Sequence, residues 1–387
     1  MTNGWLNMIF WGIAGLLFAM SGRMLWHLRW ARRLPPSAPG NDEGSAPPPP
    51  RVSVVLAARD EAARVEQTVR RLLAQRGVEV EVIVVDDRST DGTGEILRRL
   101  SQEDERVKAL RVETLPPEWL GKCHACHVGA SAACGEWILF TDADCWLKED
   151  VLLRALRVAA RERAEHITLT PGIRPENRGA AAWHLAFLLT LADWLSGVNR
   201  DKAKAYLGMG AFNLVRASAY QACGGYGALR LTVVDDVKLG LLLRRAGFRT
   251  RGFIGGDDTE CHWGTTIGGM IRVMEKNYFA AVDYRIGAAL GSSLMGTALW
   301  ATALCGPFTA SAPGLAAGVG VLSLSIPAAV AARRLRWPLS PAFLAPFIFP
   351  ALFYAILNST VVTLRHGGIR WRDTFYPLEL LHRGTVR

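Results

Sequence analysis

Cysteine is scarce in this sequence, whose 387 residues include seven, scattered from Cys123 to Cys305. An odd number without the close spacing of small extracellular domains excludes a disulfide framework and favours a reducing compartment. Acidic residues are also outnumbered, 35 against 45 Lys and Arg, for a net charge of +10. Because basic clusters directly flank apolar stretches, we attribute the excess to membrane lipid rather than nucleic acid; the clusters are Arg29, Arg32 and Arg33, and Arg333, Arg334 and Arg336.

No positively charged side chain precedes the first apolar run, Trp5 to Gly22, and four arginines follow within residues 23–33. A cleaved signal peptide has the opposite order, with its positive charges ahead of the apolar region. The run is long enough to span a bilayer, and the positive-inside rule places the following residues in the cytoplasm. We therefore predict an uncleaved transmembrane anchor over residues 1–34 with its N-terminus outside.

The remainder of the chain divides by composition. Residues 35–50 are rich in Pro, Gly, Ser and Ala and predict a linker, and a folded domain is expected over 51–285. Three further apolar stretches, at about 286–305, 312–332 and 339–364, predict C-terminal membrane segments within 286–364, followed by a basic tail over 365–387. Four simple spans would put that tail outside, against the positive-inside rule, so either the proline-rich last segment re-enters or one span is wrongly assigned.

The folded domain alternates between strand and helix patterns. Apolar β-branched runs at Val52–Ala57 and Val80–Val85 are each followed by a helical period, at Glu61–Ala74 and Gly92–Leu100, and a further strand is expected at Trp137–Thr141. This order predicts an α/β fold with a parallel sheet covered on both faces. Ligands of such sheets bind beyond the carboxyl ends of the strands, where the acidic motifs below occur.

Two polar motifs follow the first two strands. The first is Ala58-Arg59-Asp60-Glu61, where a nucleotide could meet backbone and carboxylate groups. The second is Asp86-Asp87 followed by Arg88-Ser89-Thr90-Asp91-Gly92. Helix capping by Ser89, Thr90 or Asp91 would explain the turn residues of the second motif but not the pair of aspartates at the end of a strand.

The third motif is Asp142-Ala143-Asp144, directly after the third strand. Alternation along an extended segment points both carboxylates to the same side, so they could hold one hard divalent cation bridging a diphosphate. Such a cation would neutralise charge on a departing nucleoside diphosphate. An isolated Asp-x-Asp is common in solvated loops, so the motif indicates a metal site only together with the neighbouring motifs.

These motifs in this order, with Gly121-Lys122 and the small-residue run Gly129 to Glu136 between them, resemble the family 2 glycosyltransferases over about residues 51–251. The resemblance implies the GT-A fold, a Rossmann-like mixed sheet with helices on both faces, here with transmembrane helices at both ends. It also implies an inverting transfer from a UDP- or GDP-type nucleotide-sugar, assisted by Mg²⁺ or Mn²⁺. Asp142 and Asp144 would bind the metal, and the donor-binding residues would be Asp60, Glu61, Asp86, Asp87, Lys122 and Asp142.

A fourth motif, Val234-Asp235-Asp236-Val237, is similar to the acidic pair of that family, whose second carboxylate is the catalytic base. A sugar hydroxyl is a weak nucleophile, and a carboxylate that takes its proton contributes about 10²–10⁴-fold. We therefore expect Asp236 to be the base and Asp235 its supporting neighbour. The alternative is that both merely offset a helix dipole, and the two roles are compatible. The segment Gly208 to Tyr226 matches the acceptor-side strand and loop of the family.

A competing pattern is Cys123-His124-Ala125-Cys126-His127, which matches covalent haem attachment and could suggest zinc. Zinc needs tetrahedral ligation, which a single helical turn supplies poorly. The cytoplasmic side predicted for this segment is also wrong for haem c. In the family this stretch is a helix after the glycine-lysine, and His127 departs from the asparagine often found nearby. A haem- or metal-binding membrane protein is therefore the minor alternative.

The acceptor is indicated less directly. Residues 180–197 are apolar with few interruptions and predict a buried core helix or an interfacial helix. The Gln-x-x-Arg-Trp motif of processive polysaccharide synthases is absent from the sequence. We therefore expect transfer of one sugar to a lipid, with polymer extension as the alternative. Pro117 to Lys122 resembles the ceramide glucosyltransferase-like and hopanoid-associated bacterial branches, which implies a multi-pass protein of the bacterial inner membrane with a cytoplasmic catalytic domain.

Overall fold

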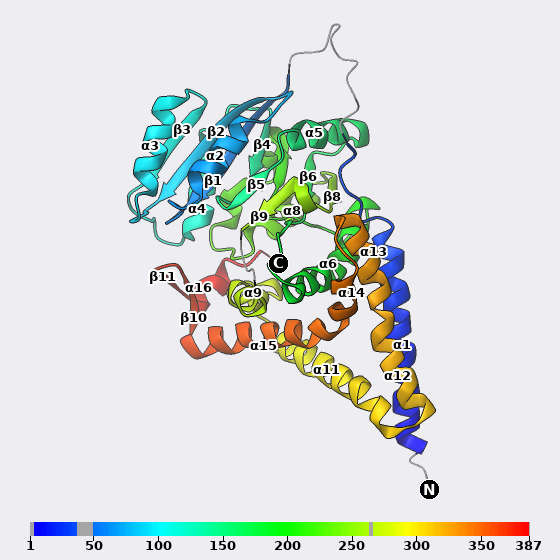
Figure 1. The fold of residues 1–387 in the computed structure, drawn as a ribbon. Helices are drawn as coiled ribbons and strands as arrows, with labels where there is room; N and C mark the ends of the chain where they lie inside the picture. The colour runs from blue at the N-terminus through cyan, green and yellow to red at the C-terminus, as the bar shows by residue number, and fades with distance from the viewer. Residues whose placement is uncertain (1–3, 37–48, 263–265, 387) are drawn as a thin grey trace. The chain divides into compact units, whose positions relative to one another are not determined.

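The computed structural model describes residues 4–36, 49–262 and 266–386, and these fall into two units (Figure 1). We call them the helical unit and the sheet unit. The helical unit comprises Met1–Arg32, Pro175–Ser196 and Trp263–His382. The sheet unit comprises Arg33–Arg174, Gly197–His262 and Arg383–Arg387. Each unit is therefore assembled from segments that are far apart in the sequence.

A seven-stranded sheet with the order β3-β2-β1-β4-β7-β6-β8 forms the centre of the sheet unit. Strands β1 to β4 run parallel, whereas β7 is antiparallel to both of its neighbours. The strands are β1 (Arg51–Ala58), β2 (Glu79–Asp87), β3 (Val107–Val112), β4 (Trp137–Phe140), β6 (His166–Leu169), β7 (Asn213–Arg216) and β8 (Thr250–Phe253). The sheet is thus mixed, as the family resemblance implies, and the parallel sheet expected from the alternating pattern is its first half.

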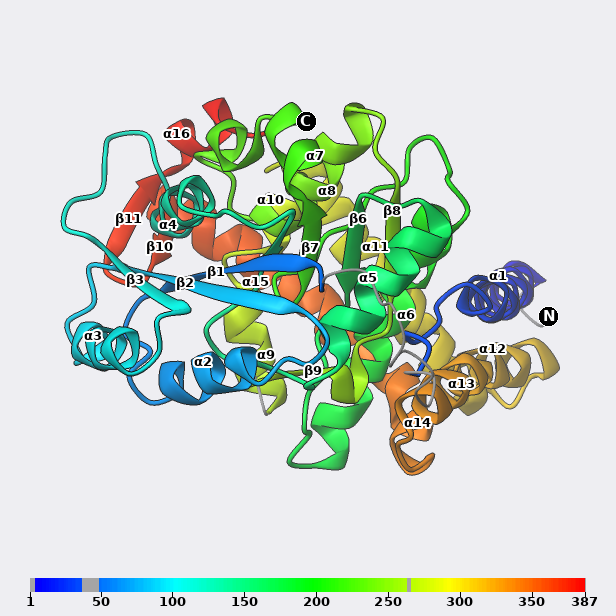
Figure 2. The same ribbon diagram turned by 90° about the horizontal axis from the view of Figure 1, so that it is seen from above.

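Apolar side chains on both faces of the strands explain why the sheet is covered on both sides. Val54 in β1 lies opposite Val82 in β2 and Leu139 in β4, and all three are fully buried. The same face packs against three helices, α2 (Val65–Leu73), α3 (Thr93–Glu103) and α5 (Val151–Glu162). On the other face, α4 (Gly121–Ser131) approaches so closely that a Cβ at Gly129 would lie 2.5 Å from Val55 (Figure 2). Burial on both faces accounts for the continuous apolar runs of these strands.

The helix expected from Glu61 begins four residues later, at Val65. Side chains that follow β2 accept hydrogen bonds from the backbone N–H groups ahead of α2. Asp60 N–H donates to Ser89 Oγ at 3.0 Å, and Glu61 N–H donates to Thr93 Oγ1 at 2.9 Å. Gly92 is the N-cap residue of α3 and not Ser89, Thr90 or Asp91, although Asp91 Oδ1 accepts the N–H of Thr93, the first residue of the helix, at 3.1 Å. These polar residues join the two loops at the carboxyl end of the sheet instead.

Shorter elements complete the sheet unit. Strands β5 (Cys145–Leu147) and β9 (Thr259–Cys261) pair antiparallel and hold the chain that leaves β4. The connections are α7 (Ala217–Ala222), the 3₁₀ turn η1 (Gly225–Leu229), α8 (Asp235–Arg245) and the 3₁₀ turn η2 (Gly256–Asp258). Thr232 Oγ1 also donates to the carbonyl of Gly384, so the end of the chain packs on this unit.

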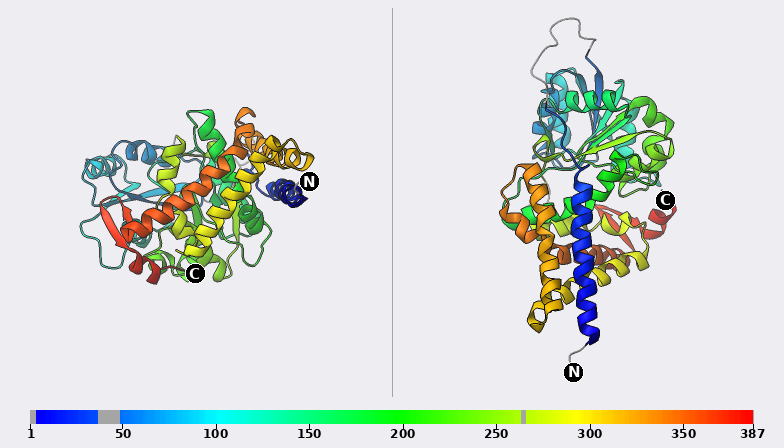
Figure 3. Two further views of the ribbon diagram at one scale, coloured as in Figure 1. Left: turned by 90° about the horizontal axis from the view of Figure 1, so that it is seen from below. Right: turned by 90° about the vertical axis from the view of Figure 1, so that its right-hand side faces the viewer.

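The helical unit is built from long apolar helices. In Figure 3, α1 (Gly4–Leu28) and α12 (Ala312–Ser323) lie side by side, and α11 (Ile286–Cys305) runs beside α15 (Phe349–His366). The remaining elements are α6 (Arg178–Asn199), α9 (Ile267–Met274), α10 (Tyr278–Ala281), η3 (Gly306–Thr309), α13 (Ser325–Leu335), α14 (Ser340–Leu344), η4 (Ala345–Ile348), β10 (Gly368–Trp371), β11 (Thr374–Pro377) and α16 (Leu378–Arg383).

Several of these helices present apolar side chains outward. Trp5 is 81% exposed on α1, and Met295 is 74% exposed on α11. The Arg334 guanidinium donates to the carbonyl oxygens of Leu28, the last residue of α1, and of Ala31 just after it. Large exposed apolar surface with internally bonded backbone is typical of segments that contact lipid.

Within the part of the chain that the structure describes, five segments are long and apolar enough to cross a membrane: Gly4–Leu28, Arg178–Asn199, Ile286–Thr309, Ala312–Leu335 and Ser340–His366. The second, α6, is nonetheless largely buried, and its Asp193 accepts hydrogen bonds or ion pairs from Arg23 and His27 of α1. A single crossing by α6 would put β6 and β7 on opposite sides of a membrane, whereas these strands pair in register. We conclude that α6 does not cross.

The last of the five segments is interrupted, as its prolines predict. The 3₁₀ turn η4 separates the five-residue α14 from α15, and Pro346 lies inside that turn. At a rise of 1.5 Å per residue, the 18 residues of α15 span about 27 Å, slightly less than the hydrocarbon core of a bilayer. The segment is therefore not one straight span.

Candidate active site

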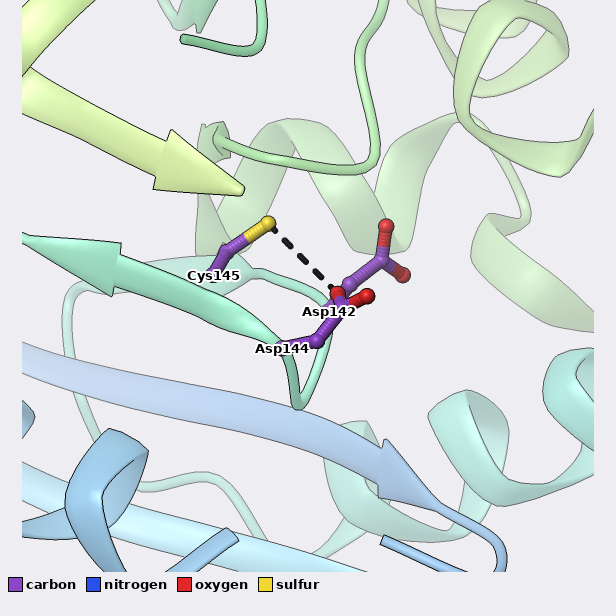
Figure 4. Close-up of side chains that lie close together, drawn as sticks. All are labelled: Asp142, Asp144 and Cys145. Atoms are coloured by element: carbon purple, nitrogen blue, oxygen red, sulfur yellow. Dashed lines mark hydrogen bonds between the residues drawn. The ribbon is translucent and has the colours of Figure 1, made fainter. Parts of the chain in front are cut away.

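Two carboxylates follow β4 at the carboxyl edge of the sheet. Ligand atoms of Asp142, Asp144 and Cys145 lie within 4.8 Å of one another, and Figure 4 shows the two aspartates beside the thiol, whose Sγ contacts Asp144. Burial, followed by the charges of Asp142 and Glu61, raises the pKa of Asp144 to about 6. Two carboxylates that disfavour each other's ionisation form a site that a cation would stabilise.

The Lys122 side chain reaches this carboxylate pair from the first turn of α4. Its ammonium Nζ lies 2.7 Å from Asp142 Oδ1 and 3.9 Å from Asp235 Oδ2. Burial opposes the charge on Lys122, but Asp142, Asp235 and Asp236 outweigh it and raise its pKa well above the usual value. The lysine therefore stays protonated among three carboxylates and is placed to meet an anionic ligand.

The acidic pair Asp235-Asp236 begins α8, and its two members have different environments. Asp235 is fully buried and accepts a 2.8 Å hydrogen bond from the Tyr226 hydroxyl. Asp236 accepts hydrogen bonds from the backbone N–H groups of Gly210 at 2.6 Å and Val237 at 2.8 Å. Burial, followed by the charge of Asp235, raises the pKa of Asp236 to about 6. A carboxyl with that pKa can accept a proton near neutral pH.

Gly210 connects the two acidic motifs. Its carbonyl accepts the N–H of Asp142 at 3.1 Å, while its own N–H donates to Asp236. A Cβ at this position would lie only 2.6 Å from Asp142 Oδ2. The sequence indicates that glycines near residue 208 permit close approach, but it does not indicate that Gly210 joins the motifs. The pairing of Tyr226 with Asp235 was likewise not predicted, since nine residues and a turn separate them.

The motif after β1 is bonded to the motif after β2. Asp60 lies in the left-handed region with φ 54° and accepts the Thr90 N–H through Oδ1 at 2.8 Å. Glu61 lies close enough to Asp144 to contribute to its raised pKa. The structure thus places both predicted residues at the carboxyl edge, with Asp60 holding the neighbouring loop.

The two aspartates that end β2 also differ. Asp86 is buried and accepts the Ser89 N–H at 2.9 Å and Arg111 Nη1 at 3.1 Å, so it organises the turn. Asp87 accepts Arg88 Nε at 2.8 Å and lies against the start of α4, where a Cβ at Gly121 would overlap its carboxylate. Asp87 is therefore the member of the pair that lies beside the Lys122 helix.

The residues around Asp142 suit a hard divalent cation. Carboxylate oxygens are the ligands that Mg²⁺ and Mn²⁺ prefer, and the lysine ammonium on Asp142 shows that a positive group is accommodated there. Cys145 is buried with its Sγ 2.7 Å from Cys261 Sγ, and a sulfur ligand is softer than these cations prefer. Asp142 and Asp144 are thus the candidate ligands.

The Cys123-His124-Ala125-Cys126-His127 pattern is not brought together as a second metal site. Over residues 4–36, 49–262 and 266–386, the one group of at least three His, Cys, Asp or Glu side chains with metal-binding spacing is Asp142, Asp144 and Cys145. Cys123 donates to the Thr232 carbonyl inside the core, and His127 lies against Trp119 at a ring-centroid distance of 5.1 Å. Both residues are used in packing.

Comparison with known proteins identifies the domain that carries this site. The model of the family described as "Glycosyl transferase family 2" matches residues 53–224. The chain is 26% identical over 214 residues to the 4,4'-diaponeurosporenoate glycosyltransferase of Staphylococcus haemolyticus, covering 52% of this chain and 55% of that one. It is 28% identical over 196 residues to the beta-monoglucosyldiacylglycerol synthase of a Nostoc strain, covering 49% and 40%. The matches thus span about half the length of these curated relatives.

A solved structure extends the likeness over nearly the whole chain. The mannosyltransferase PcManGT from Pyrobaculum calidifontis, in complex with GDP-Man and Mn²⁺, superposes with a TM-score of 0.55 and 19% identity. The superposition covers 93% of this chain and 99% of that one, which establishes the shared fold. The chain therefore has the GT-A fold, and its residues 53–224 match the glycosyl transferase family 2 model.

Proposed function

We propose that this protein transfers one sugar from a nucleotide-sugar to a lipid acceptor. The observation that carries the proposal is the convergence of Lys122, Asp142, Asp144 and Asp236 at one edge of the sheet, joined through Gly210. This arrangement supplies an ammonium group and two candidate metal-binding carboxylates for a diphosphate, beside a carboxylate with a pKa near neutrality. The names of two relatives, a 4,4'-diaponeurosporenoate glycosyltransferase and a beta-monoglucosyldiacylglycerol synthase, favour a lipid acceptor.

Each residue of the site has a separate role in the proposed reaction. Asp236 accepts the proton of the acceptor hydroxyl as the acceptor oxygen bonds to the anomeric carbon and the bond from that carbon to the diphosphate oxygen breaks. Lys122 stabilises the negative charge that develops on the leaving diphosphate. Asp235, fixed by Tyr226, holds Lys122 and keeps the pKa of Asp236 raised. A divalent cation held by Asp142 and Asp144 would neutralise further diphosphate charge.

The donor side is proposed from the same edge. Asp60, Glu61, Asp86 and Asp87 lie at the ends of the first two strands, where a nucleotide of UDP or GDP type would bind. Asp86 and Asp60 shape the loops, and Asp87 is the carboxylate nearest to the helix of Lys122. Inversion at the anomeric carbon is proposed from the family resemblance, with the acceptor attacking opposite the leaving diphosphate.

Lipid analysis tests the function as a whole. Lipids from cells with and without the protein are compared by mass spectrometry, and we expect one glycolipid, larger than its precursor by a single sugar, to depend on the chain. A ladder of products would favour the polymer-extending alternative. Identical lipid profiles, in cells where the protein is shown to be present and folded, would contradict the proposal.

Replacing Gly210 with Ala should damage the site without touching a charged group. The new Cβ would lie 2.6 Å from Asp142 Oδ2 and would displace the carboxylate, and a misplacement of about 1 Å can cost about 10²-fold in rate. We expect kcat/KM for sugar transfer to fall by at least tenfold. Gly227→Ala is the matched control, because its nearest heavy atom is 3.9 Å away. Equal activity of both variants would refute the role of Gly210.

The pH dependence follows from the raised pKa of Asp236. Below about pH 6 the carboxyl is protonated and cannot accept the acceptor proton; above it the carboxylate is present. We therefore expect kcat, measured with saturating Mg²⁺ and donor, to rise between about pH 5 and pH 7 and then to level. A kcat that is constant across this range would show that Asp236 does not act as the base.

We also propose a membrane topology. The sheet unit contains both His262 and Arg383, so the chain between them crosses a membrane an even number of times. Two of the three C-terminal candidates therefore cross. The interrupted segment Ser340–His366 is the one that does not, since α15 is short and carries Asn358, Ser359 and Thr360. Three spans then leave the N-terminus outside and the sheet unit in the cytoplasm of a bacterial cell.

Reporter fusions check this topology. Green fluorescent protein, which fluoresces when it is fused on the cytoplasmic side, is attached after Trp337 in a truncated chain and after Arg387 in the full chain. We expect both fusions to fluoresce, because Ser340–His366 leaves and returns on the same side. Fluorescence of the first fusion alone would mean that this segment crosses.

A further inference from the structure

A cavity of about 470 Å³ lies inside the helical unit, between the end of α9, the last turns of α15 and the β10–β11 hairpin. Its volume is in the range of small-molecule sites. Basic side chains line it from three different elements: Lys276 after α9, His366 in the last turn of α15, and Arg370 in β10. Glu275 is the one acidic residue among those that line it. With His366 neutral, the lining carries a formal charge of +1.

The cationic groups are held in position by the fold. The Lys276 ammonium lies 4.1 Å from the centre of the Trp371 ring and donates to Asn277 Oδ1 at 2.8 Å. Gly367, with φ 67°, ends α15 in a left-handed turn that leads directly into β10 and so brings Arg370 to the cavity. Glu275 accepts a 3.0 Å hydrogen bond from Asn358 Nδ2, and this donor partly stabilises the negative charge of Glu275. The cavity is therefore preorganised for an anion.

The surroundings of the cavity indicate what carries that anion. Helix α15 is mainly apolar until its last turn, which contains Arg365 and His366. Apolar side chains on the same elements are exposed, with Tyr354 55% and Phe375 43% accessible, and Phe375 and Val362 also line the cavity. A basic cavity at the end of an apolar helix, with an apolar rim, matches a lipid whose phosphate enters and whose chains stay outside.

We propose that this cavity binds the phosphate of an anionic phospholipid headgroup. Arg370 offers the planar donor fork that pairs with phosphate oxygens, and Lys276 adds a point charge. The Phe375 and Val362 side chains contact the glycerol and the first methylenes of the chains. The site lies within the helical unit alone, and its occupation does not depend on sugar transfer in the sheet unit.

Native mass spectrometry of the full-length protein in a neutral detergent tests this site. The protein is titrated with phosphatidylglycerol and, separately, with diacylglycerol of the same chains. We expect one phosphatidylglycerol per chain to bind at least tenfold more tightly than diacylglycerol. Lys276→Gln combined with Arg370→Gln should remove that preference, and Glu275→Gln, which keeps an acceptor for Asn358, should increase phosphatidylglycerol affinity. An increase in affinity cannot come from a damaged fold.

Two further variants serve as matched controls. Arg365→Gln removes an exposed charge from the same helix end that does not line the cavity, and its affinity should stay within about twofold of the wild type. Lys276→Arg combined with Arg370→Lys keeps both charges and should retain most of the binding. Equal loss in Arg365→Gln and in the double Gln variant would overturn the site, as would equal binding of the two lipids. Displacement of the lipid by millimolar inorganic phosphate would assign the cavity to free phosphate instead.

Discussion

Replacing Asp236 with Asn should lower kcat for sugar transfer by about 10²–10⁴-fold, the usual contribution of a positioned general base. The amide keeps the size of the side chain and can still accept the Gly210 N–H, but it cannot take the proton of the acceptor hydroxyl. The Michaelis constant for the donor should change by less than about threefold, because Asp236 acts on the acceptor. Initial rates with purified protein and a nucleotide-sugar give both constants.

A surface aspartate provides the control for this substitution. Asp104 pairs with Arg106 on the exterior of the sheet unit at 2.7 Å, and Asp104→Asn should leave kcat unchanged within about twofold. Thermal unfolding establishes that both variants are folded. A kcat above about a tenth of the wild-type value in Asp236→Asn would remove this residue from the role of base.

Replacing Asp144 with Ala should lower kcat/KM by about 10²–10³-fold, comparable to the loss of one electrostatic stabiliser at a developing charge. The variant lacks one of the two carboxylates proposed to hold the metal, so the Mn²⁺ concentration for half-maximal activity should also rise by at least tenfold. Titration of Mn²⁺, followed by the electron paramagnetic resonance signal of the unbound ion, measures this change without reference to turnover.

A variant of the neighbouring thiol distinguishes the loss of a metal ligand from local damage to the fold. Cys145 Sγ lies 3.8 Å from Asp144 Oδ1 and is buried against Cys261, and a soft sulfur is a poor ligand for Mn²⁺. Cys145→Ala should therefore leave the Mn²⁺ affinity within about threefold. If Asp144→Ala binds Mn²⁺ as tightly as the wild type, the metal is held elsewhere. If Cys145→Ala loses as much affinity as Asp144→Ala, the ligand set is wrong.

The parts of the fold that follow from local sequence were predictable. The runs that form β1 and β2 are buried on both faces, and such strands consist of nearly continuous β-branched and aliphatic residues. The aspartates that end β2 and β4 could be placed at one edge, because parallel strands end together. The start of α2 could not be placed, since the hydrogen bonds that displace it come from residues 29 or more positions away.

The contacts that make the site are long-range and were not visible in the sequence. The Lys122–Asp142 ion pair and the bridge through Gly210 join segments that lie 20 to 68 residues apart. The different roles of Asp86 and Asp87 also depend on tertiary contacts, because adjacent residues of one strand face opposite sides. The number of membrane spans could not be decided from the sequence. It depends on the pairing of β6 with β7 and on the return of the chain at Arg383 to the sheet unit.

The acidic edge of the sheet is proposed to move a sugar from a nucleoside diphosphate to a lipid. The direct measurement uses purified protein with Mn²⁺, membrane lipid extract and a panel of UDP- and GDP-sugars. Nucleoside diphosphate and glycolipid are quantified together. We predict equal molar amounts of both products with one donor, and neither product above background with Asp236→Asn. Release of nucleoside diphosphate without glycolipid, or an active Asp236→Asn variant, would contradict the account.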